Sequence, residues 1–435
     1  MNPLDRLRPA DRMLDGSVPV AASVSGVGAP DDARMSSQAR LRYAVSVVLV
    51  LLAVLACVPV WTGGVALTFA TQCMILFVFA QSFALLLGEA GLLSFGHAVY
   101  LGLGAFATAH ALNFAGAQGW PLPTPLVPLV GALAGVAGGA TLGWFASRRG
   151  GIAFAMITLG TGELLATGAT AWPALFGGEG GIATDRTYGW SPIDLGSPRH
   201  VYVLIAIWAL ASVAAMRAFA RTPLGLAANA VREQPMRAAF VGFDVRRVRY
   251  RTSIVSAGFA GVAGALLTLA TEQVSADAFS LARSGAVLVA VVLGGASGWG
   301  GPLAGTLLYV GCSVVLALYT RAWPFYLGLM FIGVVSFAPR GIVGLPQTLR
   351  AWPSPRRCAG ALVIAAGLVL GIEMLYRLTL ASSDGTTLAA FGLRIDATAA
   401  GSWIAAAACV LAGLALGWAR LGRARRRVGD VRVDS

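Results

Sequence analysis

Three side chains in this sequence could do chemistry inside otherwise apolar segments. Glu163 lies in the middle of the run IAFAMITLGTGELLATGATAW, Thr158 precedes it in the same run, and His97 stands near the start of another. A charged side chain at mid-bilayer costs about 2.5–3.5 kcal/mol, so such residues usually face a bundle interior or a water-filled path. We therefore expect these residues to line or brace a translocation pathway. The alternatives are a packing role for His97 and a protonated structural role for Glu163.

Two glycine-rich stretches accompany these side chains. Gly96 and Gly102 belong to GLLSFGHAVYLGLGAF, and Gly294, Gly295 and Gly300 belong to VLGGASGWGGPLAG. Glycine lets helices approach closely and makes a helix easier to distort, and interrupted apolar segments are typical of transporter pathways. We expect hinges or gate elements at both stretches, with small-residue packing or an ordinary turn as the alternatives.

The sequence lacks the residues that several other kinds of chemistry need. All 32 basic residues are arginine, so the P-loop motif GxxxxGK[ST] is absent, and no HExxH motif is present. The five cysteines form no CxxC pattern. The arginines lie in short loops rather than on a soluble domain with interleaved aromatic residues, which argues against nucleic-acid binding. We expect no catalytic residue, no metal site and no cofactor bound by this chain.

Membrane-spanning helices must position these side chains, because 57% of the 435 residues are hydrophobic and only 12% are charged. Continuous apolar runs of about 20 residues are long enough to cross a bilayer. We predict an all-α polytopic membrane protein with about 10–12 transmembrane helices and glycine-interrupted segments. The expected spans are 43–60, 64–87, 93–115, 125–146, 152–172, 201–219, 253–273, 284–296, 302–320, 325–343, 358–380 and 401–421. The spans 284–296 and 302–320 could instead form one broken or re-entrant pair.

The distribution of arginine predicts how these spans are oriented. Cytoplasmic loops carry an excess of basic residues, and alternate loops of this layout are rich in arginine. Both termini are then cytoplasmic. Residues 1–42 form a disordered polar tail and residues 423–435 a basic tail.

The loop 220–252 is too long for a simple connection, and it contains two helix signals. Thr222 before Pro223 is typical of a helix start, and Pro235 can open a second short helix that Gly242 closes. This second helix would expose apolar residues between arginines. It could bind a groove on a partner protein or lie on anionic lipid.

Four segments together resemble the permease subunits of branched-chain amino-acid (Liv-type) ABC importers. They are GEAGLLSFGHAVYLGLGAFATA, GGIAFAMITLGTGELL, LGLAANAVREQPMRAAFVGFDVRRVRYRTSIVSAGFAGVAGAL and SGAVLVAVVLGGASGWGGPLAGTLL. The resemblance covers about residues 43–345 and identifies 220–252 as a coupling loop for the ATPase. The matching coupling positions are Arg232, Glu233, Ala238, Ala239 and Gly242. Pro235 and Phe240 depart from the family pattern, as does Gly151-Ile152.

This resemblance implies the partners and the location. They are a second permease subunit, two cytoplasmic ATP-binding subunits that hydrolyse ATP, a periplasmic solute-binding protein and the lipid bilayer of the bacterial inner membrane. Residues 346–422 would form an additional pair of transmembrane helices.

Other functions stay open at the level of the sequence. They are a permease for urea or short amides, and a proton-coupled secondary transporter that uses Glu163. A membrane-embedded enzyme would need more ionisable residues on converging spans than the sequence offers. A lipid flippase or scaffold would be favoured if neither an ATPase nor a binding protein accompanied the chain.

Overall fold

The computed structural model describes residues 64–344, apart from positions 193, 297–299, 319 and 339–340, and then residues 387–390 and 393–396 with a few single positions. The expected spans 43–60, 358–380 and 401–421 and both tails fall outside the described residues, but for some of those single positions.

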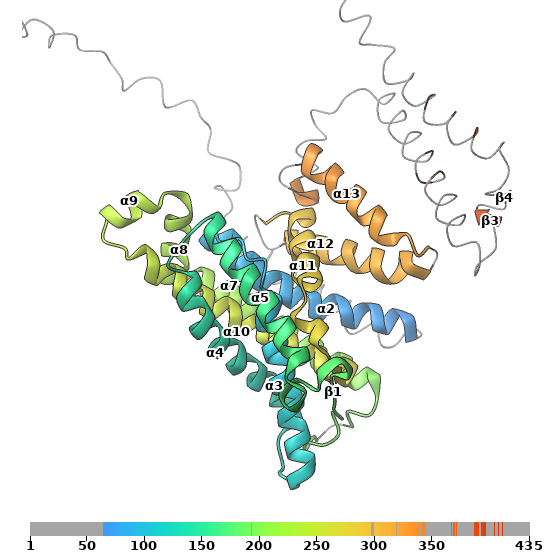
Figure 1. The fold of residues 1–435 in the computed structure, drawn as a ribbon, viewed down its shortest axis with the longest axis horizontal. Helices are drawn as coiled ribbons and strands as arrows, with labels where there is room; N and C mark the ends of the chain where they lie inside the picture. The colour runs from blue at the N-terminus through green and yellow to red at the C-terminus, as the bar shows by residue number, and fades with distance from the viewer. Residues whose placement is uncertain are drawn as a thin grey trace, which may run out of the picture. The chain divides into compact units, whose positions relative to one another are not determined.

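Long apolar helices make up most of the described chain (Figure 1). Seven are long and apolar enough to cross a membrane, which confirms an all-α polytopic membrane fold. The helices are α2 (Gly64–Ala84, continued by the π-helix η2, Leu85–Glu89), α3 (Ala98–Gln118), α4 (Pro128–Ala146, after the 3-10 helix η3, Thr124–Leu126), α5 (Ile152–Ala171), α7 (Pro198–Ala220), α10 (Val245–Thr271) and α12 (Gly300–Val310, continued by η6, Gly311–Val315, and η7, Leu316–Leu318). Two apolar helices are shorter, α11 (Leu281–Gly294) and α13 (Trp323–Phe337).

Short elements join the long helices. They are α6 (Pro173–Phe176), η4 (Gly178–Gly180), β1 (Ile182–Ala183), α8 (Pro223–Glu233), α9 (Pro235–Phe240), β2 (Gln273–Val274), η5 (Ala276–Phe279), η8 (Ile342–Gly344), β3 (Thr387–Ala390) and β4 (Leu393–Asp396). β1 pairs with β2 in antiparallel register, Ile182 opposite Val274, and β3 pairs with β4. The apolar runs did not predict these strands, because two to four residues carry no readable alternation.

Side-chain caps start three of the helices. The Thr222 hydroxyl accepts a hydrogen bond from the Gly225 N–H at the start of α8, as the Thr-Pro pair predicted. Asp244 caps α10 and Ser280 caps α11 in the same way. These caps satisfy backbone donors that a helix start leaves unpaired.

Helix α10 packs along α3 and α4, and α2 packs against α7, α10, α11 and α12 (Figure 1). A side chain at Gly131 of α4 would collide with the carbonyl oxygen of Gly261 of α10, and one at Gly261 would collide with that of Gly131. Small residues allow this backbone contact, and close packing is what holds helices together in lipid.

A main core of buried apolar residues from α2, α3, α7, α10 and α11 fills the helix bundle. A second buried cluster lies where α2 ends, and it joins Leu86 and Leu92 to Val231 of α8, Ala238 of α9 and Val248 of α10. The second cluster attaches the short helices α8 and α9 to the bundle.

Candidate functional site

The chain leaves the helical conformation between α2 and α3. Residues 91–97 form no helix, so the span expected from residue 93 becomes helical only at Ala98. A side chain at Gly96 would collide with the carbonyl oxygen of Thr158 in α5, and the Phe95 N–H donates to Thr158 Oγ1 at 3.2 Å. The structure therefore brings two predicted site residues, Gly96 and Thr158, into direct contact.

His97, also in this break, is fully buried at 0% exposure. Its ring stacks on Phe79 with centroids 5.3 Å apart, and the Phe83 and Tyr100 rings meet it edge-on at 5.4 and 5.7 Å. Its Nε2 lies 3.0 Å from Ser82 Oγ, and its Nδ1 has no hydrogen-bond partner among the described residues. His97 is thus part of an aromatic cluster, and its ring packs on one face of Phe79.

Gly102 makes room for an aromatic ring. A side chain there would collide with the ring of Phe279 in η5. Phe279 stacks on Phe106 of α3 at 5.3 Å, and Phe176 of α6 meets Phe106 edge-on at 5.0 Å. Gly102 therefore lets η5 pack against α3.

The second glycine-rich stretch joins α11 to α12. A side chain at Gly294 would collide with the carbonyl oxygen of Gly301, so the two helices touch through their backbones. Gly295 has a φ of 105°, which favours glycine. Gly300 begins α12 and has open space where a side chain would stand. Helix α11 ends at Gly294, within the glycine-rich stretch in which the sequence predicted a break.

Glu163 lies on a different face of α5 from Thr158. Thr158 is 3% exposed and faces the break, whereas Glu163 is exposed beside Leu164. The two residues predicted together in one run are therefore separated, one against Gly96 and the other on the outside of this chain.

A cavity of about 550 Å³ lies beside α2. One part of its lining is apolar and includes Phe79 and Leu267, so the ring that His97 supports forms part of the wall. The polar part of the lining consists of Thr68, Thr71, Gln72, Arg186, Thr271, Asp277, Arg283, Tyr309 and Ser313. A cavity that combines an apolar wall with polar groups can hold a small molecule.

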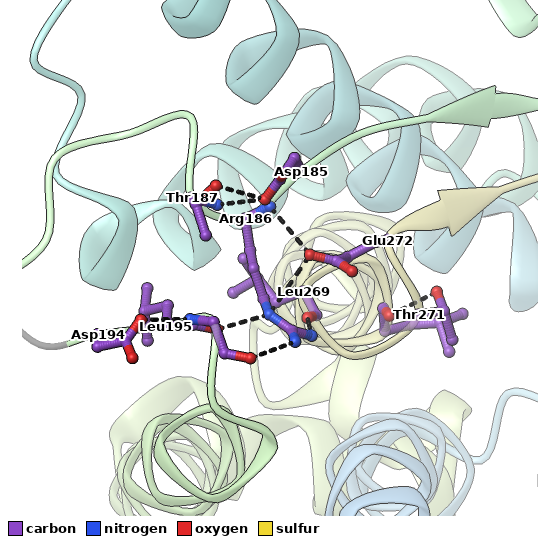
Figure 2. Close-up of polar contacts among 10 residues, drawn as sticks. Asp185, Arg186, Thr187, Asp194, Leu195, Leu269, Thr271 and Glu272 are labelled. Carbon is purple, nitrogen blue, oxygen red and sulfur yellow. Dashed lines mark hydrogen bonds and ion pairs between the residues drawn. The ribbon is translucent and has the colours of Figure 1, made fainter.

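Arg186, in the segment after β1, bonds to several residues around it (Figure 2). It donates to the carbonyl oxygens of Leu195 at 2.7 Å, Leu269 at 3.3 Å and Gly196 at 3.3 Å, and its Nε lies 3.4 Å from a Glu272 carboxylate oxygen. Arg186 therefore fastens this segment to the end of α10.

The neighbour Asp185 stabilises the same turn. Its Oδ1 accepts hydrogen bonds from both the N–H and the hydroxyl of Thr187, each at 2.7 Å. These donors, the hydroxyl first, hold the pKa of Asp185 below its ordinary value because they favour the ionised carboxylate.

The cavity's own ion pair is formed by Arg283 in the first turn of α11 and Asp277 in η5. Arg283 Nε lies 3.0 Å from Asp277 Oδ2, and the side chains are 43% and 58% exposed. Sequence reasoning placed this segment in a loop and missed the pair. The signal that could have found it is an acid and a base directly before an apolar run too short to cross a bilayer.

The predicted coupling residues lie on α8, α9 and the turn that follows. Arg232 donates to the carbonyl oxygen of Gly88 in η2. Ala238 is buried, whereas Glu233, Ala239 and Gly242 are exposed. The structure thus places some of these residues at the joint with η2 and others on the surface.

Helix α9 itself presents an apolar surface. Phe240 is 86% exposed, and Met236 and Val241 are 73% and 75% exposed. The helix and its exposed side chains agree with the sequence prediction, although Gly242 follows the helix end by two residues.

The family model described as "Branched-chain amino acid transport system / permease component" matches residues 65–338 of this chain. The chain belongs to this family. Among its relatives are two proteins described as "High-affinity branched-chain amino acid transport system permease protein LivM", from Escherichia coli strain K12 and Salmonella typhimurium strain LT2. Each is 27% identical over 302 residues, which cover 64% of this permease component and 69% of the relative. No solved structure matches.

Proposed function

We propose that this permease component works in an ATP-binding cassette importer that moves branched-chain amino acids across the bacterial inner membrane. A second permease subunit completes the passage, two cytoplasmic subunits hydrolyse ATP, and a periplasmic binding protein delivers the solute. Both termini lie in the cytoplasm. The names of the two relatives support the solute class, since each is described as a branched-chain amino acid permease.

The observation that carries the proposal is the exposed surface of α9. Met236, Phe240 and Val241 stand out from the chain, while Ala238 anchors the helix in the buried cluster below. Exposed apolar side chains on a short, anchored helix suit insertion into a groove of a partner. We assign that groove to an ATP-hydrolysing subunit.

The exposed Glu163 supports the presence of a second permease subunit. A carboxylate that faces lipid at the middle of a span would cost about 2.5–3.5 kcal/mol. Glu163 is exposed in this chain, so contact with another subunit or with the pathway would relieve that cost. His97, behind the cavity wall, and Thr158, against Gly96, brace the passage from inside.

The test is purification of the tagged chain from bacterial membranes, with identification of the accompanying subunits and measurement of ATP hydrolysis and L-leucine uptake. The double variant Gly242→Trp, Ala239→Arg should lose the ATP-hydrolysing subunits and the uptake, because the changes add bulk to the α9 surface and to the turn that follows it. Gly180→Trp, at an exposed position with open space, is the control and should retain both.

A stable protein that purifies without any ATP-hydrolysing subunit and whose uptake is abolished by a protonophore would contradict the proposal. That result would favour a proton-coupled transporter.

A further inference from the structure

We propose that Arg283 and Asp277 form a binding site for the carboxylate and the ammonium of an α-amino acid inside the cavity beside α2. This inference rests on the proposed function for its class of solute. It goes beyond it by naming the site on this chain that holds the solute during passage.

The ion pair lies beside the break that precedes α3. The hydroxyl of Ser284, next to Arg283, accepts a hydrogen bond from the Ala98 N–H at 3.1 Å, which places the first turn of α11 beside the break before α3. The same break carries His97, which packs on Phe79. The cavity extends along α2 from Leu67 to Phe79, which is 12 residues or about 18 Å of helix. An ion pair that lines a cavity between apolar helices points to a solute path.

Arg283 has binding capacity that Arg186 lacks. Arg186 also lines the cavity, but its guanidinium is engaged by three carbonyl oxygens and Glu272. Arg283 uses only Nε, toward Asp277, and its two terminal amino groups make no hydrogen bond within the described part of the chain. Those two groups can receive a carboxylate.

The pair suits a zwitterion better than a simple ion. Arg283 and Asp277 together carry no net charge, so a bound zwitterion adds none, whereas an anion or a cation would leave an uncompensated charge in the cavity. The second carboxylate oxygen of Asp277 has no partner among the described residues and can accept from an ammonium.

The rest of the cavity suits a branched apolar side chain. Phe79, Leu267, Ile75 and Leu101 supply apolar wall, and the volume of about 550 Å³ is within the range of small-molecule sites. The amide of Gln72 and the phenol of Tyr309 are further polar groups of the lining.

The test is saturation-transfer NMR on the full chain in lipid nanodiscs with three probes. They are L-leucine, 4-methylpentanoate, which lacks the ammonium, and 3-methylbutylamine, which lacks the carboxylate. L-leucine should bind at least tenfold more tightly than either analogue, because each analogue lacks one charge-assisted contact.

Variants separate the two halves of the site. Arg283→Gln should weaken the binding of L-leucine and 4-methylpentanoate about tenfold or more and leave the binding of 3-methylbutylamine unchanged. Asp277→Asn should weaken the binding of 3-methylbutylamine and leave that of 4-methylpentanoate unchanged. Arg199→Gln, at an exposed position outside the cavity lining, is the matched control and should bind as wild type. Arg283→Lys keeps the charge and should retain weaker binding if Arg283→Gln does not fold.

L-leucine binding that is unchanged in both variants, or lost equally for all three probes, would overturn this site. Failure of the proposed function is a separate result, because it would appear as absent ATP-dependent uptake of L-leucine by the purified assembly, which the binding experiment does not use.

Discussion

His97 acts through its neighbours, since its ring is enclosed by Phe79, Phe83, Tyr100 and Ser82. The sequence indicated that this histidine is unusual, because it stands in a glycine-rich apolar run. It could not indicate the packing, because Phe79 and His97 are 18 positions apart and meet only after the chain reverses at the break. Phe79 lines the cavity, whereas His97 does not.

We expect His97→Ala to lower the free energy of unfolding by about 2–4 kcal/mol and to reduce uptake, because it empties the centre of a buried aromatic cluster. Glu163→Gln is expected to leave the fold unchanged, because Glu163 is exposed, and to reduce uptake. Unfolding in detergent and uptake of L-leucine by membrane vesicles measure the two effects. If both variants transport normally at normal expression, these residues neither line nor brace the path.

At the scale of elements, the break between α2 and α3 is held by contact with α5. The closely spaced glycines predicted a hinge or gate element here, but the expected span 93–115 placed Gly96 inside the helix and not in the break before it. The sequence did not predict that Gly96 rests on the backbone at Thr158, because no local pattern shows which helix comes close. The loop helices α8 and α9 were easier to predict, since Thr222, Pro223 and Pro235 are local start signals.

Gly96→Val should destabilise the protein by about 1–3 kcal/mol, because its side chain would collide with the carbonyl oxygen of Thr158 and push α5 away. Gly160→Val, on helix α5 where open space surrounds it, is the control and should change stability little. Thermal unfolding of the two purified variants in detergent compares them. Equal unfolding midpoints would show that α5 does not support the break.

For the whole molecule, the alternation of apolar runs predicted the helical membrane fold, and the described helices confirm it. The lengths of the individual helices were less predictable. The runs at 284–296 and 325–343 are helices α11 and α13 of 14 and 15 residues, both shorter than a typical crossing. The cavity depends on α2, α10, α11 and α12 together, and an assembly of that kind has no signature within any one run.

The proposed orientation predicts which loops a reagent can reach. In a background with Cys57, Cys73, Cys312, Cys358 and Cys409 replaced, Thr187→Cys should react with a membrane-impermeant maleimide in intact cells. Ala239→Cys on α9 should react only after the inner membrane is opened, because α9 would face the cytoplasm. Both positions are exposed in this chain. Labelling of Ala239→Cys in intact cells would reverse the orientation.

The attachment of Arg186 to Leu269 has a mechanical consequence. Helix α10 has 27 residues and is therefore about 40 Å long. One end is packed against α8 and α9, and the other carries the hydrogen bonds to Arg186 and the strand β2 that pairs with β1. We expect a displacement of α9 to reach the segment around Arg186 through α10, because one uninterrupted helix connects the two ends.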